Sequence, residues 1–153
     1  MQKDKNIFYL LISQVMKLEV IHETQQEEYN HLNYLYTAFG KDNKDSMDSA
    51  KYQCDTAKEQ IDKITKDISQ LQLDSNMLEY YKLYKEKSEL LQKIWVCETE
   101  IGYISSKLMF DCICDDEVGK EIADKRNQYE QQKKVANERM KKVVMEMRYL
   151  YSA

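Results

Sequence analysis

The chain has 153 residues, of which 33% are charged and 42% hydrophobic, and its formal net charge is -4 at pH 7. This acidic balance argues against a general nucleic-acid binder, because such proteins neutralise phosphates with Lys and Arg. There is no proline and there are only three glycines, so the strongest helix breaker, which costs about 3 kcal/mol inside a helix, is absent. The composition predicts an all-α protein with narrow apolar seams and wide solvated faces.

The N-terminal residues carry no targeting signal that we recognise. Met1 to Lys5 is charged, and the apolar run from Ile7 to Ile12 is short and lacks a cleavage site typical of a signal peptide. No stretch approaches the ~20 apolar residues of a membrane span. We therefore expect a cytoplasmic protein whose four cysteines are reduced thiols.

The first predicted helix covers residues 3–39. Apolar and aromatic residues recur there in steps of three and four, the spacing of a heptad seam. Ile7, Ile21 and Leu35 widen this stripe on one side. A helix of this length must pair lengthwise with another helix. The seam positions are Phe8, Leu11, Val15, Leu18, His22, Gln25, Tyr29, Leu32, Tyr36 and Phe39.

A turn and a second helix, residues 46–73, follow. Gly40 suits the left-handed residue just past a helix end, and Asp45 or Ser46 suits the next N-cap. This pattern predicts a short turn between two antiparallel helices. The heptad positions of the second helix are Met47, Ala50, Cys54, Ala57, Ile61, Ile64, Ile68 and Leu71.

The heptad register fails near Asp74, Ser75 and Asn76. These are good capping residues, so a second turn is one interpretation, and a continuous helix with a local distortion is the other. A third helix over 76–110 has its seam at Tyr80, Leu83, Lys87, Leu90, Ile94, Cys97, Ile101, Ile104 and Leu108. The fourth helix is predicted over 116–150, with a stripe at Val118, Ile122, Tyr129, Ala136, Met140, Val143, Met147 and Leu150.

Two Glu-x-x-His pairs, Glu19 with His22 and Glu28 with His31, have the spacing that di-iron helical bundles use. Those bundles take each pair from a different helix, whereas here both pairs lie on one helix, roughly 13 Å apart along its axis. We therefore expect no metal site, and interpret His22 and Gln25 as a polar notch in the seam that fixes register and partner choice.

No other motif indicates chemistry. Cys112 and Cys114 form a lone C-x-C without the second half that a zinc site needs. The chain has no G-x-S-x-G, no phosphate-binding glycine loop and no H-E-x-x-H. We expect no enzyme activity and no cofactor.

Two further surfaces are candidates for binding. The last helix is basic, and Lys133, Lys134, Arg139, Lys141 and Lys142 are predicted contacts for an acidic surface such as a microtubule. A solvated helix face is the alternative for these residues. Tyrosines cluster at Tyr29, Tyr34 and Tyr36 and at Tyr80, Tyr81 and Tyr84, where they either form an interface core or line seam edges.

The sequence therefore predicts a single all-helical unit over residues 1–153, as an antiparallel coiled coil or an elongated helical bundle. The narrow seams and the polar notch favour extended helices completed by partner chains over a self-contained bundle. We expect a non-enzymatic coiled-coil subunit of a hetero-oligomeric intracellular complex, of the cytoskeletal or mitotic type: spindle, centrosome or kinetochore. The alternatives are an adaptor in vesicle tethering or organelle biogenesis and, more remotely, a metal-binding four-helix bundle.

Overall fold

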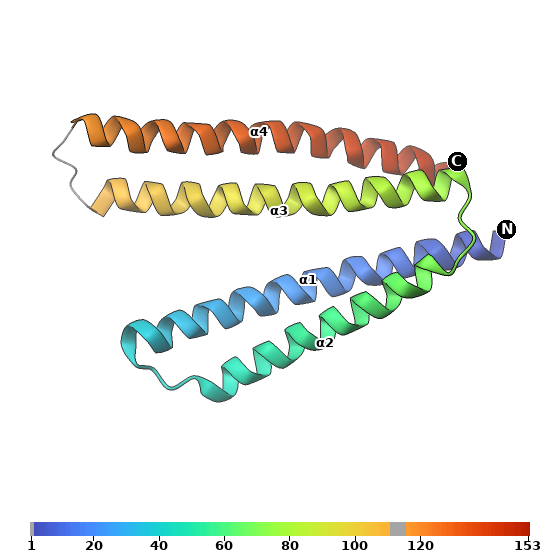
Figure 1. Cartoon of the computed structure of the whole chain (residues 1–153), viewed down its shortest axis with the longest axis horizontal. Coiled ribbons are helices and arrows are strands. Elements are labelled where there is room, and N and C mark those ends of the chain that lie inside the picture. Colours follow the sequence, from blue (N-terminus) through green and yellow to red (C-terminus); the bar gives the residue numbers. More distant parts are fainter. Residues whose placement is uncertain (1, 111–115) are drawn as a thin grey trace. The chain divides into compact units, whose positions relative to one another are not determined.

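The computed structural model describes residues 2–110 and 116–153, and within these ranges the chain is all-α, with four helices and no strand. The helices are α1 (Gln2–Phe39), α2 (Lys44–Ser69), α3 (Ser75–Phe110) and α4 (Asp116–Ser152). The chain divides into two compact units, Met1–Leu73 and Asp74–Ala153. In each unit two helices lie antiparallel, α1 against α2 and α3 against α4 (Figure 1). That residues 1–153 form a single unit remains a prediction.

The turn between α1 and α2 begins at Gly40, as predicted. Gly40 has φ +64°, which a residue with a Cβ rarely adopts, and its N–H donates to the Tyr36 carbonyl over 2.9 Å. The predicted N-cap of α2 at Asp45 or Ser46 is wrong. Asn43 occupies that position, and its carbonyl accepts the Met47 N–H over 2.9 Å, so α2 begins two residues earlier.

The break before α3 is a true turn, not a distortion of one long helix. Helix α2 ends at Ser69, and the N–H groups of Gln70 and Leu71 close a tight last turn. Asp74 then caps α3, because its Oδ1 accepts the Met77 N–H over 2.8 Å. The distortion that we considered for residues 74–76 is therefore excluded.

The core of the first unit is narrow and contains small residues. Phe8, Ile12 and Val15 of α1 are buried. On α2 the buried residues are Ala50, Cys54, Ala57 and Ile68. The three small ones follow one another in heptad steps, so the two helices can lie close together along this stretch. In the second unit the buried residues are Met77, Leu83, Tyr84, Cys97 and Ile104 of α3 and Ala136, Val143 and Met147 of α4.

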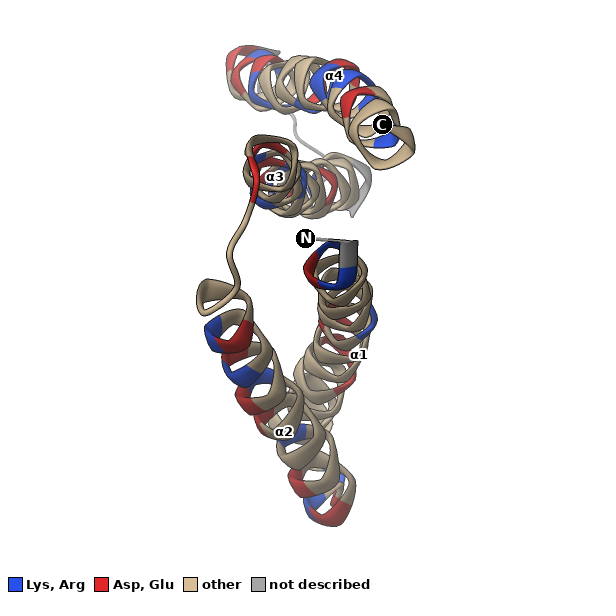
Figure 2. Cartoon of the chain, turned by 90° about the vertical axis from the view of Figure 1, so that its right-hand side faces the viewer, with Lys and Arg blue, Asp and Glu red and all other residues tan. Residues whose placement is uncertain are grey.

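Charge is distributed unevenly along the first unit. Acidic and basic residues interleave along α2, whereas α1 has long uncharged stretches, drawn tan in Figure 2. No Lys, Arg, Asp or Glu occurs from Asn6 to Met16 or from Tyr29 to Gly40. No helix among the described residues is long and apolar enough to cross a membrane.

Candidate helix-packing surfaces

The predicted seam of α1 lies mostly along its contact with α2, but its last two positions do not. Among the predicted residues, Phe8 and Val15 are buried, and the six from Leu11 to Leu32 are half-buried. Ile12, which the heptad pattern left out, is only 1% exposed. Tyr36 and Phe39 remain 55% and 71% exposed. The half-buried set is Leu11, Leu18, His22, Gln25, Tyr29 and Leu32.

The exposure of Tyr36 and Phe39 follows from the different lengths of the two helices. Cys54 lies opposite His22, so antiparallel stepping places Lys44, the first residue of α2, opposite about residue 32 of α1. Helix α1 has 38 residues and α2 has 26, so the end of α1 continues beyond the start of α2. The last seam positions of α1 therefore have no α2 turn beside them.

The remaining predicted seam residues are all buried or half-buried. On α2, Ile68 is buried and Ile61, Ile64 and Leu71 are half-buried. On α3, Leu83 and Ile104 are buried, and Leu90, Ile94, Ile101 and Leu108 are half-buried. Helix α3 packs on α4 and α1 on α2, and that these seams take partner helices stays a prediction.

The predicted polar notch at His22 contains a buried thiol. The Cys54 thiol donates to the His22 carbonyl over 3.5 Å, and His22 and Gln25 are half-buried beside it. Burial raises the pKa of the Cys54 thiol, and the nearby Asp55 carboxylate raises it further. The thiol is therefore kept protonated, and a protonated thiol is a poor nucleophile and metal ligand.

The residues of the Glu-x-x-His pairs do not gather around a common point. Glu28 and His31 are exposed, whereas Glu19 and His22 are half-buried. Across the described parts of the chain, no three His, Cys, Asp or Glu side chains group as metal ligands would. Cys112 and Cys114 lie outside the described residues.

Two of the basic residues predicted to meet an acidic surface pair with carboxylates of α3. Arg139 donates to Glu86 through Nε and Nη2, at 2.6 and 2.9 Å, and Lys133 lies 3.2 Å from Glu98. The hydrogen bond from Arg139 lowers the pKa of Glu86. Lys134, Lys141 and Lys142 are exposed, so they are the members of the predicted set that face solvent.

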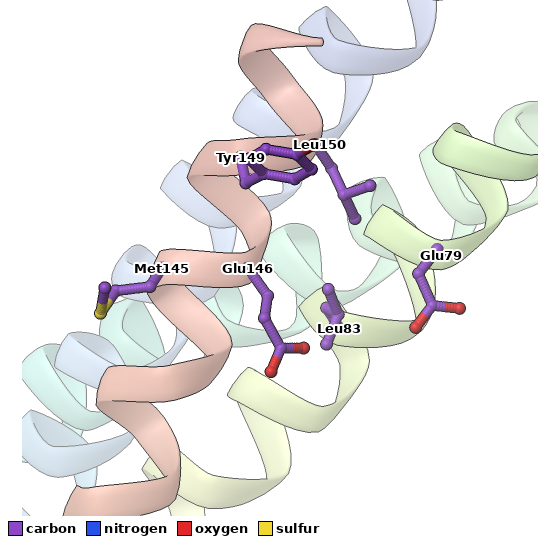
Figure 3. Close-up of a pocket in the computed structure, with 6 residues that line it drawn as sticks. All are labelled: Glu79, Leu83, Met145, Glu146, Tyr149 and Leu150. Atoms are coloured by element: carbon purple, nitrogen blue, oxygen red, sulfur yellow. The ribbon is translucent and has the colours of Figure 1, made fainter.

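A shallow groove of about 370 Å³ lies between α3 and α4 near the C-terminus. Leu83 and Leu150 project between the two helices there, with Glu79 and Glu146 at the edge (Figure 3). Glu146 also lies 3.6 Å from Arg139. Met145 and Tyr149 complete the lining and are 69% and 76% exposed. The groove is open and holds no grouping of catalytic residues.

A second stripe on α3, which the heptad pattern does not contain, runs along the helix beside the predicted seam. We call it the outer seam. Its positions recur in steps of three and four and none is charged, although a third of the chain is. The two consecutive steps of four from Leu91 to Thr99 depart from a strict heptad, which would continue at Glu98. Met77 and Tyr84 are buried, Tyr81 and Ser88 half-buried, and the rest exposed. The outer seam consists of Met77, Tyr81, Tyr84, Ser88, Leu91, Trp95, Thr99, Gly102 and Ser106.

The exposed half of the outer seam has the character of a helix-packing face. Leu91 and Trp95 are each 48% exposed. The Thr99 hydroxyl donates to the Trp95 carbonyl over 2.9 Å, so it is satisfied within the helix. A Cβ added at Gly102 would meet nothing within 4 Å. Nothing in the described chain therefore explains a glycine here, although it costs about 1 kcal/mol relative to alanine.

The signal for the outer seam was present in the sequence. The predicted tyrosine cluster contains residues of both stripes: Tyr80 belongs to the predicted seam, and Tyr81 and Tyr84 to the outer one. Tyr84 is four residues after Tyr80, so the two stripes are neighbours at this end of the helix. A search for uncharged residues in steps of three and four, without a strict heptad, would find it.

No protein-family model, curated protein or solved structure matches the chain.

Proposed function

We propose that the chain is a non-enzymatic structural subunit of a hetero-oligomeric coiled-coil complex, and that a helix of another subunit packs on the exposed half of the outer seam of α3. One observation carries the proposal: the exposed positions of the outer seam are uncharged, although α3 already packs on α4. These positions are Leu91, Trp95, Thr99, Gly102 and Ser106. A helix with apolar residues on two faces is typical of one packed between neighbours.

Physical chemistry supports a helical occupant rather than a small ligand. Leu91 and Trp95 provide large apolar contact area, and Trp is favoured in the centre of interfaces. Thr99, Gly102 and Ser106 are small, which allows another backbone to approach closely at that end. The surface is a ridge along a helix and not a concave site, so it fits another helix better than a metabolite.

Among coiled-coil assemblies we favour the cytoskeletal and mitotic type, in the cytoplasm. Small, acidic, all-helical subunits with few motifs are common in spindle, centrosome and kinetochore complexes. The exposed Lys134, Lys141 and Lys142 on α4 offer a contact for an acidic surface such as a microtubule. Localisation of a fluorescent fusion to spindle poles or kinetochores would agree with this class, and localisation to vesicles would favour a tethering adaptor.

The direct test replaces the outer seam without touching the contact between α3 and α4. In the double variant Leu91→Ser, Trp95→Ser we expect the complex partner to be lost from purifications of the tagged chain. Circular dichroism should show unchanged helicity, because both side chains are half exposed. Leu78→Ser is the matched control, since Leu78 is 54% exposed on α3 but lies off the outer seam. Equal retention of the partner by all three chains would contradict the proposal.

A further inference from the structure

Helix α1 carries a second stripe on the side turned away from α2, which we call the α1 stripe. It begins at Leu10, Ser13 and Lys17 and continues in alternating steps of three and four as far as Tyr34. Every side chain of the α1 stripe is exposed. Leu10, Val20 and Tyr34 are 58%, 63% and 61% exposed. The spacing is that of a coiled-coil seam, and it holds without a break over about 36 Å.

The α1 stripe is complementary to itself when two copies lie antiparallel and are centred on residue 22. In that alignment, residues that are equidistant from residue 22 come opposite each other. Lys17 of one copy then meets Glu27 of the other, and the same pair forms a second time by symmetry. Opposite charges across a helix pair set the choice of partner and orientation. The opposed pairs are Leu10 with Tyr34, Ser13 with His31, Lys17 with Glu27 and Val20 with Thr24.

The residues that flank the α1 stripe on one side match in the same alignment. Ile21 is 45% exposed and lies beside the two-fold axis, so it meets Ile21 of the second copy. Ile7 and Leu35 are half-buried and equidistant from Ile21, so they come opposite each other towards the ends. The pairing therefore covers the three residues that widen the predicted seam of α1.

We infer that the α1 stripe is a self-association surface, through which two copies of the chain pair antiparallel. A shift by one heptad places Lys17 opposite Val20 or Tyr34, and a parallel pair places like charges together, so one alignment alone matches the charges. A surface that binds an unrelated helix has no reason to match itself in this way. Identical surfaces related by a two-fold axis form a closed dimer.

One contact opposes the dimer and limits its strength. Glu23 is exposed beside the two-fold axis on the other flank of the α1 stripe, where it approaches Glu23 of the second copy. Like charges that meet across an interface cost free energy. Polar side chains also alternate with the apolar ones along the stripe, so we expect a reversible dimer. The inference goes beyond the proposed function and does not depend on the partner helix of α3.

The test is sedimentation of the purified full-length chain, with no other protein present, at rising concentration up to about 1 mM. We expect reversible dimerisation that Val20→Glu weakens by about tenfold or more, because it buries a charge of each copy near the centre of the pair. Tyr52→Glu is the matched control, since Tyr52 is 71% exposed on α2. It should leave the dimer unchanged.

Charge variants test the alignment. Glu23→Gln should strengthen the dimer by up to about fivefold, and a gain of affinity does not arise from misfolding. Lys17→Glu and Glu27→Lys alone should each weaken the dimer by about fivefold or more, since two pairs are lost, and the double variant should restore it. Monomeric mass at every concentration, a dimer indifferent to Val20→Glu, or a double variant no stronger than the single ones would overturn the inference.

Discussion

The Arg139 guanidinium on α4 holds the Glu86 carboxylate of α3 at two points, with Nε to Oε1 at 2.6 Å and Nη2 to Oε2 at 2.9 Å. Two parallel hydrogen bonds fix direction as well as distance. The contact therefore favours one register of α3 against α4, and it engages Arg139 within the second unit.

Removing the charge of Glu86 should lower the stability of the chain by a small but measurable amount. Both side chains are more than a third exposed, so water screens the pair. We expect Glu86→Gln to lower Tm by no more than about 5 °C. Glu89→Gln, at an exposed position of the same helix, is the control and should leave Tm unchanged. Identical melting of the two variants would show that the pair contributes nothing.

The same pair predicts a pH dependence. The hydrogen bond from Arg139 lowers the pKa of Glu86 below its ordinary value of 4.5 in the folded chain, against a smaller opposing effect of burial. The stabilisation of the folded chain by this pair is therefore fully present above about pH 4.5. It is lost as the pH falls through the lower pKa that Glu86 has in the folded chain. Urea midpoints of wild type and Glu86→Gln, measured from neutral to acidic pH, should converge at the acidic end. A constant difference would contradict this.

The Cys54 thiol should be unreactive until the chain opens. It is 5% exposed, it donates to the His22 carbonyl, and its pKa is raised by burial. In a variant with Cys112→Ser and Cys114→Ser, labelling of the remaining thiols by a maleimide should follow the fraction unfolded in urea. Fast labelling of Cys54 in the folded chain would contradict the packing of α2 against α1.

Gly102→Ala should stabilise the isolated chain. The added Cβ meets nothing within 4 Å, and alanine is the better helix former. We expect a gain of about 1 kcal/mol in the free energy of unfolding. If a partner helix approaches closely at Gly102, the same change should weaken the complex. A loss of stability in the isolated chain would mean that Gly102 is packed within it.

Ile68→Ala tests the core of the first unit. Ile68 is 1% exposed, and truncating a buried Ile costs about 2–5 kcal/mol. Val20→Ala is the control, because Val20 is 63% exposed on α1 and its truncation should cost about 0.5 kcal/mol or less. Denaturant unfolding of both variants gives the comparison. Equal losses would contradict the burial of Ile68 in the first unit.

The helices were predictable because their ends carry local signals. Gly40 adopts a positive φ, and Asp74 accepts the N–H that a helix start leaves free, so these two positions marked the turns. Asn43 was missed as the start of α2 because Asp45 and Ser46 are equally good caps by residue type. Only the observed backbone distinguishes them.

The surfaces were harder to predict, because they depend on how two helices align. The heptad pattern placed Tyr36 and Phe39 in a seam, but it contains no information on where the facing helix begins. Likewise, the engagement of Lys133 and Arg139 depends on which α3 carboxylate lies opposite each of them. The outer seam of α3 was missed because its steps of four from Leu91 to Thr99 depart from the heptad pattern.

The most direct test of the proposed function is site-specific photocrosslinking from position 95 in cells, with the same crosslinker at position 78 as the control. Trp95 lies on the outer seam and Leu78 does not, although both are about half exposed. We expect a discrete product at position 95 in which the crosslinked peptide belongs to a heptad-patterned helix of another protein, and none at position 78. The absence of a product at 95, or the same products at both positions, would contradict the assignment of this protein as a subunit that assembles through α3.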